Sequence, residues 1–153
     1  AARWLNEPKN RLVTAELLAQ PSYVDVSTEI IERALAGSLV TTAEGESAQA
    51  PQFLKFFDGA AQFPWRSQAV WIATQLAVRL GLDRSEAAVA ARACFRSDLY
   101  RQNIGVLGID LPLASEKLEG TMSEPIAARS TAGEIMLGPD SFFDGQVFDP
   151  VGV

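Results

Sequence analysis

The sequence predicts a mainly helical fold with few short strands. Three observations indicate it: helix-capping residues recur along the chain, glycines follow several of the expected helices, and apolar residues repeat at helical spacing in the middle of the sequence. The chain has 153 residues, of which 48% are hydrophobic. That length suits one domain, and that composition can fill a core. We therefore expect a folded chain whose core is helical.

Two helices are expected in the first third of the chain. Asn6 offers a capping oxygen and Pro8 is tolerated in a first turn, which predicts a helix from about Glu7 to Ala19. Ser27 is the expected N-cap of the second helix, and Gly37 supplies its left-handed exit. The apolar face expected on this second helix consists of Ile30, Ala34 and Leu35.

The next stretch lacks helical periodicity. Residues 38–52 are rich in Thr, Ala, Glu, Gly and Ser, which predicts an exposed loop with one short strand at Ser38–Thr42. An aromatic cluster follows at Phe53–Phe57 and ends in the turn sequence Asp58–Gly59. We expect a boundary or an excursion of the chain at this loop.

The region from Trp65 to Leu80 gives the clearest helix signal in the sequence. Apolar residues fall on two of its faces, so we expect a helix that is buried on more than one side and that ends at Gly81. The first of these faces consists of Trp65, Ala69, Ile72, Ala73, Leu76 and Leu80. The second consists of Val70, Trp71, Ala77 and Val78.

Two further helices complete the expected core. Asp83 with Glu86 three residues later forms a capping-box sequence, which predicts a helix from Arg84 to Phe95. Ser97 is the expected cap of the next helix, and Gly108 its exit.

From residue 113 to 153 we expect an irregular tail that docks on a surface, because it is rich in turn residues yet carries three phenylalanines. A weak helix at Ala114–Leu118 and an extended piece at Glu134–Leu137 are the regular elements expected within it.

Composition excludes several classes of function. The chain has no histidine and one cysteine, Cys94, so Ser-His-Asp, Cys-His and His-ligated zinc sites cannot be built from it alone. The apolar surroundings of Cys94 predict a buried, inert thiol. The formal charge of −6 disfavours nucleic-acid binding, and no apolar run is long enough to insert into a membrane. We expect no catalysis, no cofactor and no metal.

An acidic cluster near the end of the chain is the remaining candidate for chemistry. Asp140, Asp144 and Asp149 lie close to phenylalanines, as a catalytic carboxylate pair could. Each, however, lies in a turn sequence, D-S, D-G or D-P, where an aspartate accepts hydrogen bonds from nearby backbone. We therefore expect them to shape turns.

The start of the Trp65–Leu80 helix is the candidate ligand site. Trp65, Arg66 and Ser67 bring free N–H groups, the positive end of a helix dipole, a guanidinium and a hydroxyl to one place, which suits a small anion. The alternative interpretation is structural, with these residues capping the helix and packing against their neighbours.

A longer string carries a resemblance to a known family. F-D-G-A-A-Q-F-P-W-R-S-Q-A-V-W-I-A-T-Q, from Phe57 to Gln75, resembles a stretch of the nitrate/bicarbonate solute-binding proteins of ABC importers. Four flanking pieces agree in the same order: W-L-N-E-P-K-N-R from Trp4, R-S-D-L-Y-R from Arg96, L-G-I-D-L-P from Leu107 and F-F-D-G-Q-V-F-D-P from Phe142. A cytoplasmic nitrate/nitrite sensor related to that family looks similar over the same stretch.

The resemblance implies an α/β fold of two lobes, the type II periplasmic-binding-protein fold, of which residues 1–153 would be a C-terminal part. It implies non-catalytic binding of a small oxyanion, nitrate, nitrite or bicarbonate. The implied protein partner is an ABC permease, for a periplasmic protein, or a soluble RNA-binding antiterminator, for a cytoplasmic sensor. Gln68 stands where many transporters of the family have histidine, so no ligand role carries over to it.

A second hypothesis comes from another functional class. The broad apolar surfaces of the Trp65–Leu80 helix and the Phe53–Phe57 cluster are also typical of a helical protein–protein interaction module.

Overall fold

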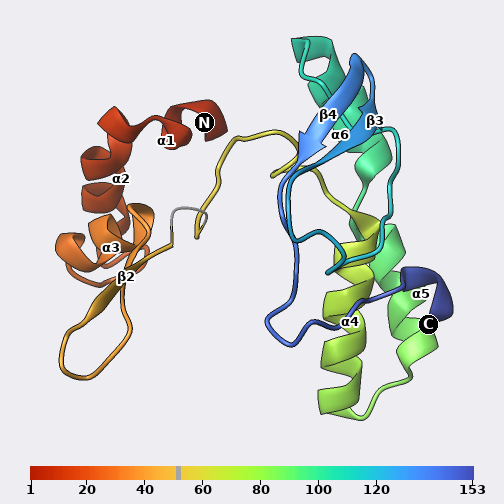
Figure 1. Cartoon of the computed structure of the whole chain (residues 1–153), viewed down its shortest axis with the longest axis horizontal. Helices are drawn as coiled ribbons and strands as arrows, with labels where there is room; N and C mark the ends of the chain where they lie inside the picture. The colour runs from red at the N-terminus through yellow and green to blue at the C-terminus, as the bar shows by residue number, and fades with distance from the viewer. Residues whose placement is uncertain (51–52) are drawn as a thin grey trace. The chain divides into compact units, whose positions relative to one another are not determined.

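The computed structural model describes residues 1–50 and 53–153, and its chain forms two compact units, Ala1–Ala61 and Gln62–Val153 (Figure 1). The first unit contains the helices α1 (Ala2–Asn6), η1 (Pro8–Asn10), α2 (Arg11–Leu18) and α3 (Thr28–Leu35), and the strands β1 (Ser38–Val40) and β2 (Ser47–Gln49). The second contains the helices α4 (Arg66–Leu80), α5 (Arg84–Cys94), α6 (Ser97–Ile104), η2 (Gly105–Leu107) and η3 (Pro150–Gly152), and the strands β3 (Ile126–Ser130) and β4 (Gly133–Leu137). The predicted helix-rich fold with few short strands is confirmed.

The beginning of the first expected helix differs from the prediction. The chain passes through the 3-10 turn η1 before α2 starts at Arg11, and Asn6 caps neither helix. Its Oδ1 instead accepts a hydrogen bond of 3.2 Å from the backbone N–H of Phe57. Buried Asn10 donates from Nδ2 to the carbonyl oxygen of Trp4, at 2.7 Å. The capping prediction was wrong because the Asn6 side-chain oxygen accepts from the backbone of Phe57, 51 residues away, rather than from a helix N-terminus.

The second helix keeps its predicted ends but turns a different face inward. Ser27 is the N-cap of α3, without a capping hydrogen bond from its side chain, and Gly37 has the expected positive φ of 70°. Ile31 is buried against α2, where Ala15 is also buried, whereas Ile30 is 59% exposed. The expected apolar face was therefore wrong at Ile30.

Residues 38–50 form a hairpin. The predicted strand is present as β1, and β2 pairs with it antiparallel so that Leu39 lies opposite Ala48. Strand β2 was not predicted, because its side chains are all exposed and show no alternation. Residues 51–52, the end of the expected 38–52 loop, lie outside the described residues.

In the second unit α4 packs on α5, and Gly81 turns the chain between them with φ of 68°. The Asp83 side chain accepts from the Glu86 backbone N–H at 2.8 Å, so the predicted cap of α5 is confirmed. Ser97 is not the cap of α6: that position falls to Arg96, and Ser97 is the first helical residue. The Ser97 hydroxyl donates instead to Ser115 Oγ, at 3.0 Å.

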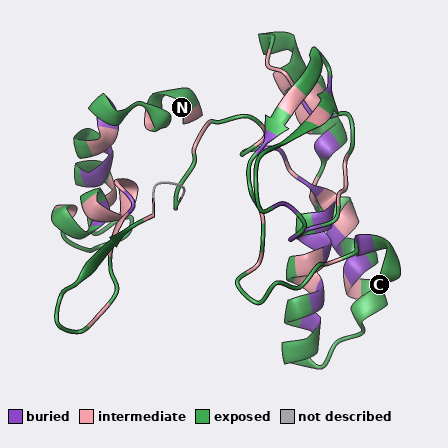
Figure 2. Ribbon diagram, viewed as in Figure 1, coloured by how far each residue is buried: buried purple, intermediate pink, exposed green. Residues whose placement is uncertain are grey.

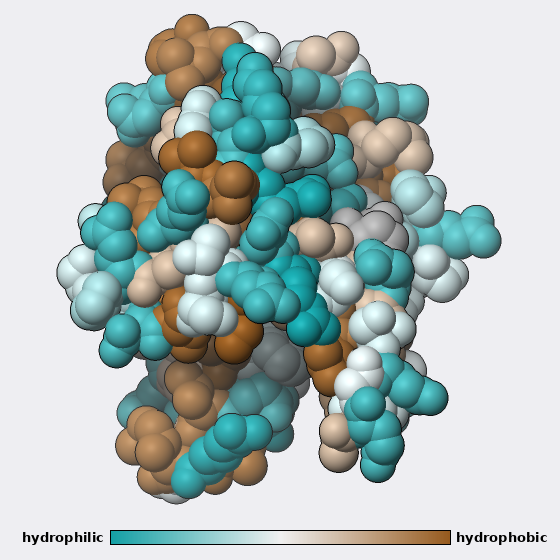
Figure 3. Space-filling model, turned by 90° about the vertical axis from the view of Figure 1, so that its left-hand side faces the viewer, coloured by the Kyte–Doolittle hydropathy of each residue, from teal (hydrophilic) through white to brown (hydrophobic). Residues whose placement is uncertain are grey.

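One face of α4 is buried (Figure 2), where two were expected. The buried face consists mostly of small side chains. Ser, Thr and Ala at this face allow α4 and α5 to approach closely. The buried residues of α4 are Ser67, Ala69, Val70, Thr74 and Ala77. Ile72, Leu76 and Leu80 are 46%, 50% and 67% exposed, so apolar side chains of α4 remain at the surface. Figure 3 shows apolar side chains on one face of the molecule. Cys94 is also exposed, contrary to the prediction.

The segment after residue 112 contains a hairpin that the sequence did not indicate. β3 pairs with β4 antiparallel, with Ala128 opposite Ile135, whereas an extended piece was expected at 134–137 alone. Residues 114–118 form no helix. The end of the chain lies against the unit through two backbone hydrogen bonds between Glu119 and Phe148, of 3.0 and 2.9 Å, and through a stacked pair of rings, Trp71 and Phe142.

Among the described residues, no helix has the length and the apolar character needed to cross a bilayer.

Candidate ligand-binding site

Trp65 precedes the first turn of α4 and is packed into the second unit. Its side chain is 4% exposed and meets the Phe63 ring edge to face, with the ring centroids 4.9 Å apart. The backbone N–H of Arg66 donates to the Ser115 carbonyl oxygen at 2.9 Å. The chain itself therefore satisfies one of the donors that the sequence offered to an anion.

Ser67 is fully buried, and both functions of its hydroxyl are used. Its Oγ donates to Glu119 Oε1 at 2.5 Å and accepts from the Lys117 backbone N–H at 3.2 Å. A carboxylate of this chain thus lies at the positive end of α4, where the helix dipole favours negative charge.

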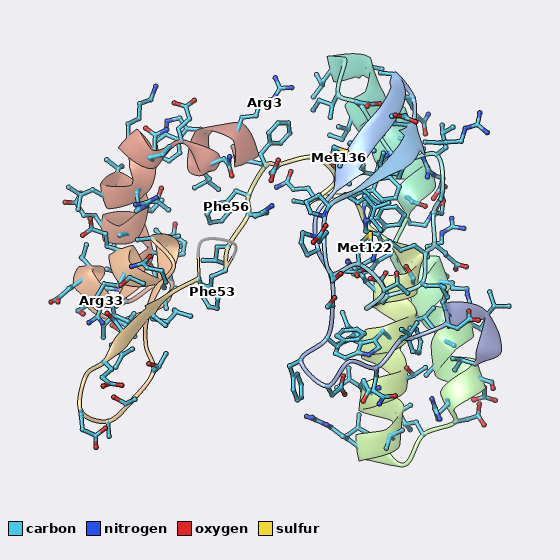
Figure 4. All side chains as sticks on the ribbon, in the orientation of Figure 1. Arg3, Arg33, Phe53, Phe56, Met122 and Met136 are labelled. Carbon is cyan, nitrogen blue, oxygen red and sulfur yellow. The ribbon has the colours of Figure 1, made fainter. Side chains whose placement is uncertain are left out.

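Glu119 belongs to a buried charged cluster, defined here as Lys117, Glu119 and Asp140. Lys117 Nζ donates to Glu119 Oε2 at 2.5 Å and also to Asp140 Oδ2. Asp140 Oδ1 accepts from the backbone N–H of Met122 at 2.8 Å, and Met122 is 6% exposed. Met122 is labelled in Figure 4. With two carboxylates and one ammonium, the cluster carries a formal charge of −1.

Arg66 is held less completely than its neighbours. Its Nη2 lies 3.5 Å from Asp98 Oδ1, and its buried Nε has no partner among the described residues. Asp98 is bound more closely by Arg96, with Nη2 to Oδ2 at 2.6 Å. That hydrogen bond is the main reason why the pKa of Asp98 lies well below its usual value. Arg66 therefore keeps donor capacity at the surface of α4.

A second guanidinium, Arg101, shapes the loop beside α4. It donates to the carbonyl oxygens of Pro112, Leu113 and Ala114, at 3.0, 3.0 and 2.6 Å, and to Ser115 Oγ at 2.9 Å. Burial first, and then the positive charge of Arg66, lower its pKa. Sequence reasoning missed this role, since no spacing links an arginine on α6 to a loop eleven to fourteen residues away.

The three predicted site residues thus come together at the start of α4, with unequal freedom. Trp65 and Ser67 are committed to contacts within the chain, as the structural interpretation expected. The Arg66 side chain is instead 33% exposed.

The acidic cluster near the end of the chain behaves mostly as predicted. Asp144 accepts from the Gln146 backbone N–H at 3.0 Å, and Asp149 accepts from that of Val151 at 2.9 Å, so both shape turns. Asp140 differs, because its side chain joins the buried cluster around Lys117.

No family model matches this chain, but it is similar in sequence to two curated proteins. It is 25% identical over 152 residues to the nitrate/nitrite binding protein NrtA of Synechococcus elongatus, covering 96% of this chain and 29% of that protein. It is 34% identical over 80 residues to the nitrate import ATP-binding protein NrtC of a Synechocystis strain, covering 50% of this chain and 12% of that protein.

The fold has a solved counterpart. The crystal structure of the periplasmic nitrate-binding protein NrtA from Synechocystis PCC 6803 matches with a TM-score of 0.71 and 20% identity, over 99% of this chain and 35% of that one. The chain spans about a third or less of the lengths of these proteins. The predicted resemblance is therefore confirmed: the chain is similar in sequence to a nitrate/nitrite binding protein, and it has the fold of part of a periplasmic binding protein.

Proposed function

We propose that this chain is part of the nitrate-binding protein of an ABC importer. The observation that carries the proposal is the similarity to the nitrate/nitrite binding protein NrtA, which runs through 96% of the chain. The similarity to the ATP-binding protein NrtC, named for nitrate import, points to the same transport system. The partner would be the membrane permease of that importer.

Arg66 is the residue that we assign to the anion, as a proposal of its own. A planar monoanion needs hydrogen-bond donors and one compensating positive charge. Arg66 offers both, because its side chain is 33% exposed and its Nη2 lies 3.5 Å from Asp98 Oδ1, a long contact. Trp65 and Ser67 would act by fixing the first turn of α4, from which Arg66 projects.

The charges around α4 would favour this placement. The cluster of Lys117, Glu119 and Asp140 is formally negative and lies at Ser67, so it repels an anion there. The charge near Asp98 is formally positive, because three arginines interact with this one aspartate: Arg66, Arg96 and Arg101. Binding alone would be the function, since nitrate import requires no bond to be made or broken.

Calorimetric titration with sodium nitrate tests the proposal on the native-length protein that contains this chain. We expect saturable nitrate binding that sodium chloride does not reproduce, and weaker binding by the 153-residue chain alone. Arg66→Gln should weaken binding roughly tenfold or more, because it removes a charged donor. Arg84→Gln, at an exposed position at the start of α5, is the matched control and should bind normally.

Two results would count against parts of the proposal separately. Unchanged nitrate affinity in Arg66→Gln would remove Arg66 from the site and leave the transport function standing. No nitrate binding by the native-length protein would remove the function itself.

A further inference from the structure

A pocket of about 270 Å³ opens beside α4, between that helix and the end of the chain. Its volume lies just below the usual range of small-molecule sites, which suits a ligand of few atoms. Residues of α4, the two carboxylates of the buried cluster and a phenylalanine from the docked end of the chain form its wall. The residues that line it are Gln68, Trp71, Ile72, Glu119, Asp140 and Phe142.

The charge that lines this pocket is negative. Glu119 and Asp140 both face it, whereas Lys117, which neutralises one of them, is not among the lining residues. The two carboxylate side chains are 5% and 16% exposed, so water screens their field poorly. Each carboxylate oxygen has a second lone pair and can accept another hydrogen bond.

The remaining wall is aromatic. The rings of Trp71 and Phe142 are stacked, with centroids 5.2 Å apart and planes inclined by 19°. The face of an aromatic ring attracts a cation, and tryptophan does so most strongly. The chain already uses this interaction nearby, because Lys117 Nζ lies 5.7 Å from the centroid of the Trp65 ring.

We propose that this pocket binds a small organic ammonium ion. An N–H of such a ligand would donate to Asp140 or Glu119, and its methyl or methylene groups would lie against Trp71 and Phe142. Gln68 adds an uncharged acceptor to the pocket wall. The proposal does not depend on nitrate binding, because the charges of this pocket repel anions.

Two other classes of ligand fit less well. A metal ion prefers several oxygen ligands, and the described residues contain no group of three or more acidic, histidine or cysteine side chains placed to hold one. A phosphate or carboxylate would meet two carboxylates without a lysine or arginine in the wall. The combination of buried negative charge with aromatic side chains favours an organic cation.

Titration of the 153-residue chain with trimethylammonium chloride, followed by ¹H–¹⁵N NMR at constant ionic strength, tests the proposal. We expect saturable shifts at the Trp71 indole N–H and at the Gln68 side-chain amide, with a dissociation constant in roughly the millimolar range for so small a ligand. Sodium chloride and sodium nitrate should not produce them.

Matched variants locate the site. Asp140→Asn and Trp71→Leu should each raise the dissociation constant roughly fivefold or more, through loss of charge and of the ring face. Asp144→Asn, an exposed aspartate on the same segment, should leave it unchanged. If Asp140→Asn loses its dispersed NMR spectrum, Trp71→Leu decides. Linear shifts that match sodium chloride, or equal affinity in Trp71→Leu and the wild type, would overturn the proposal.

Discussion

The two units of this chain hold their irregular segments by different means. In the first unit the ion pairs Lys9–Glu7 and Lys55–Asp58 lie at the surface, and buried Ala15 and Ile31 mark a small contact between α2 and α3. In the second unit the buried cluster of Lys117, Glu119 and Asp140 ties three segments together.

This difference between exposed and buried ion pairs indicates where a single substitution should most change the free energy of unfolding. An exposed ion pair gains little because water screens it, and two long side chains lose freedom in forming it. A buried charge that loses its partner keeps its full desolvation penalty. We therefore expect large effects in the loops of the second unit and small ones in the first.

The largest effect is expected at Gly120, which has φ of 88° and lies beside the buried cluster. A Cβ added there would lie 2.5 Å from the Gln146 carbonyl oxygen and 2.7 Å from the Phe142 ring. Gly120→Ala should lower the free energy of unfolding of the second unit by about 3 kcal/mol, from strain and overpacking together. Hydrogen exchange of the α4 amides would measure it.

Gly145→Ala is the control for Gly120→Ala. Gly145 has φ of 68°, but nothing lies within 4 Å of an added Cβ, so only the backbone strain remains. We expect a loss of about 1 kcal/mol. Equal losses at the two glycines would show that close packing at Gly120 contributes nothing.

The next effect is expected at Glu119. Glu119→Gln keeps the shape of the side chain but leaves Lys117 with one carboxylate, Asp140. We expect the free energy of unfolding of the second unit to fall by about 2 kcal/mol, less than for a fully unpaired buried charge because Asp140 remains. Urea denaturation measures it. Glu134→Gln, at an exposed position of β4, should change the free energy of unfolding by less than about 0.5 kcal/mol.

A pH effect should sharpen the comparison at the β3–β4 hairpin. The Ser130 hydroxyl, and then the backbone N–H of Ala132 and the Thr131 hydroxyl, hold the pKa of Asp110 below its usual value of 3.8. Ser130→Ala should raise the pKa of Asp110 toward 3.8 because the largest stabiliser of the charged form is removed. Carboxyl ¹³C NMR would measure the shift.

The sign of the stability change follows from that lowered pKa. The contribution of Asp110 is present above pH 3.8 and is lost as the pH falls through the lower pKa of the folded protein. Ser130→Ala should therefore reduce the protection of the hairpin amides from hydrogen exchange at neutral pH. The protection that remains should depend less on acid pH. An unchanged pKa of Asp110 in this variant would contradict the assignment of the Ser130 hydrogen bond.

The smallest effect is expected in the first unit, at Lys55, which pairs with Asp58 at 2.8 Å on the surface. Lys55→Ala should change the free energy of unfolding by no more than about 0.5 kcal/mol. Urea denaturation with and without added salt checks this. A loss comparable to that of Glu119→Gln would remove the contrast between the two units.

Local sequence signals predicted the helices of the second unit well. α4 begins and ends within one residue of its prediction, and the Asp83 cap and the Gly81 turn are both present. These features depend on interactions within a few residues, so the sequence contains them.

The candidate site was predictable only in part. The sequence predicted that Trp65, Arg66 and Ser67 lie together at a helix start. It did not predict that the Glu119 carboxylate accepts a hydrogen bond from the Ser67 hydroxyl. That contact joins residues 52 positions apart, and no local pattern encodes such a distance. The same reason explains Asn6, whose capping oxygen was taken by Phe57.

The sequence by itself determined which residues form the main helices, the absence of histidine chemistry, and the resemblance to nitrate-binding proteins. The tertiary structure decided which face of α4 is buried, because small side chains, rather than the large apolar ones, allow α5 to approach. It also decided the charge around α4, since Lys117, Glu119 and Asp140 meet there through folding alone.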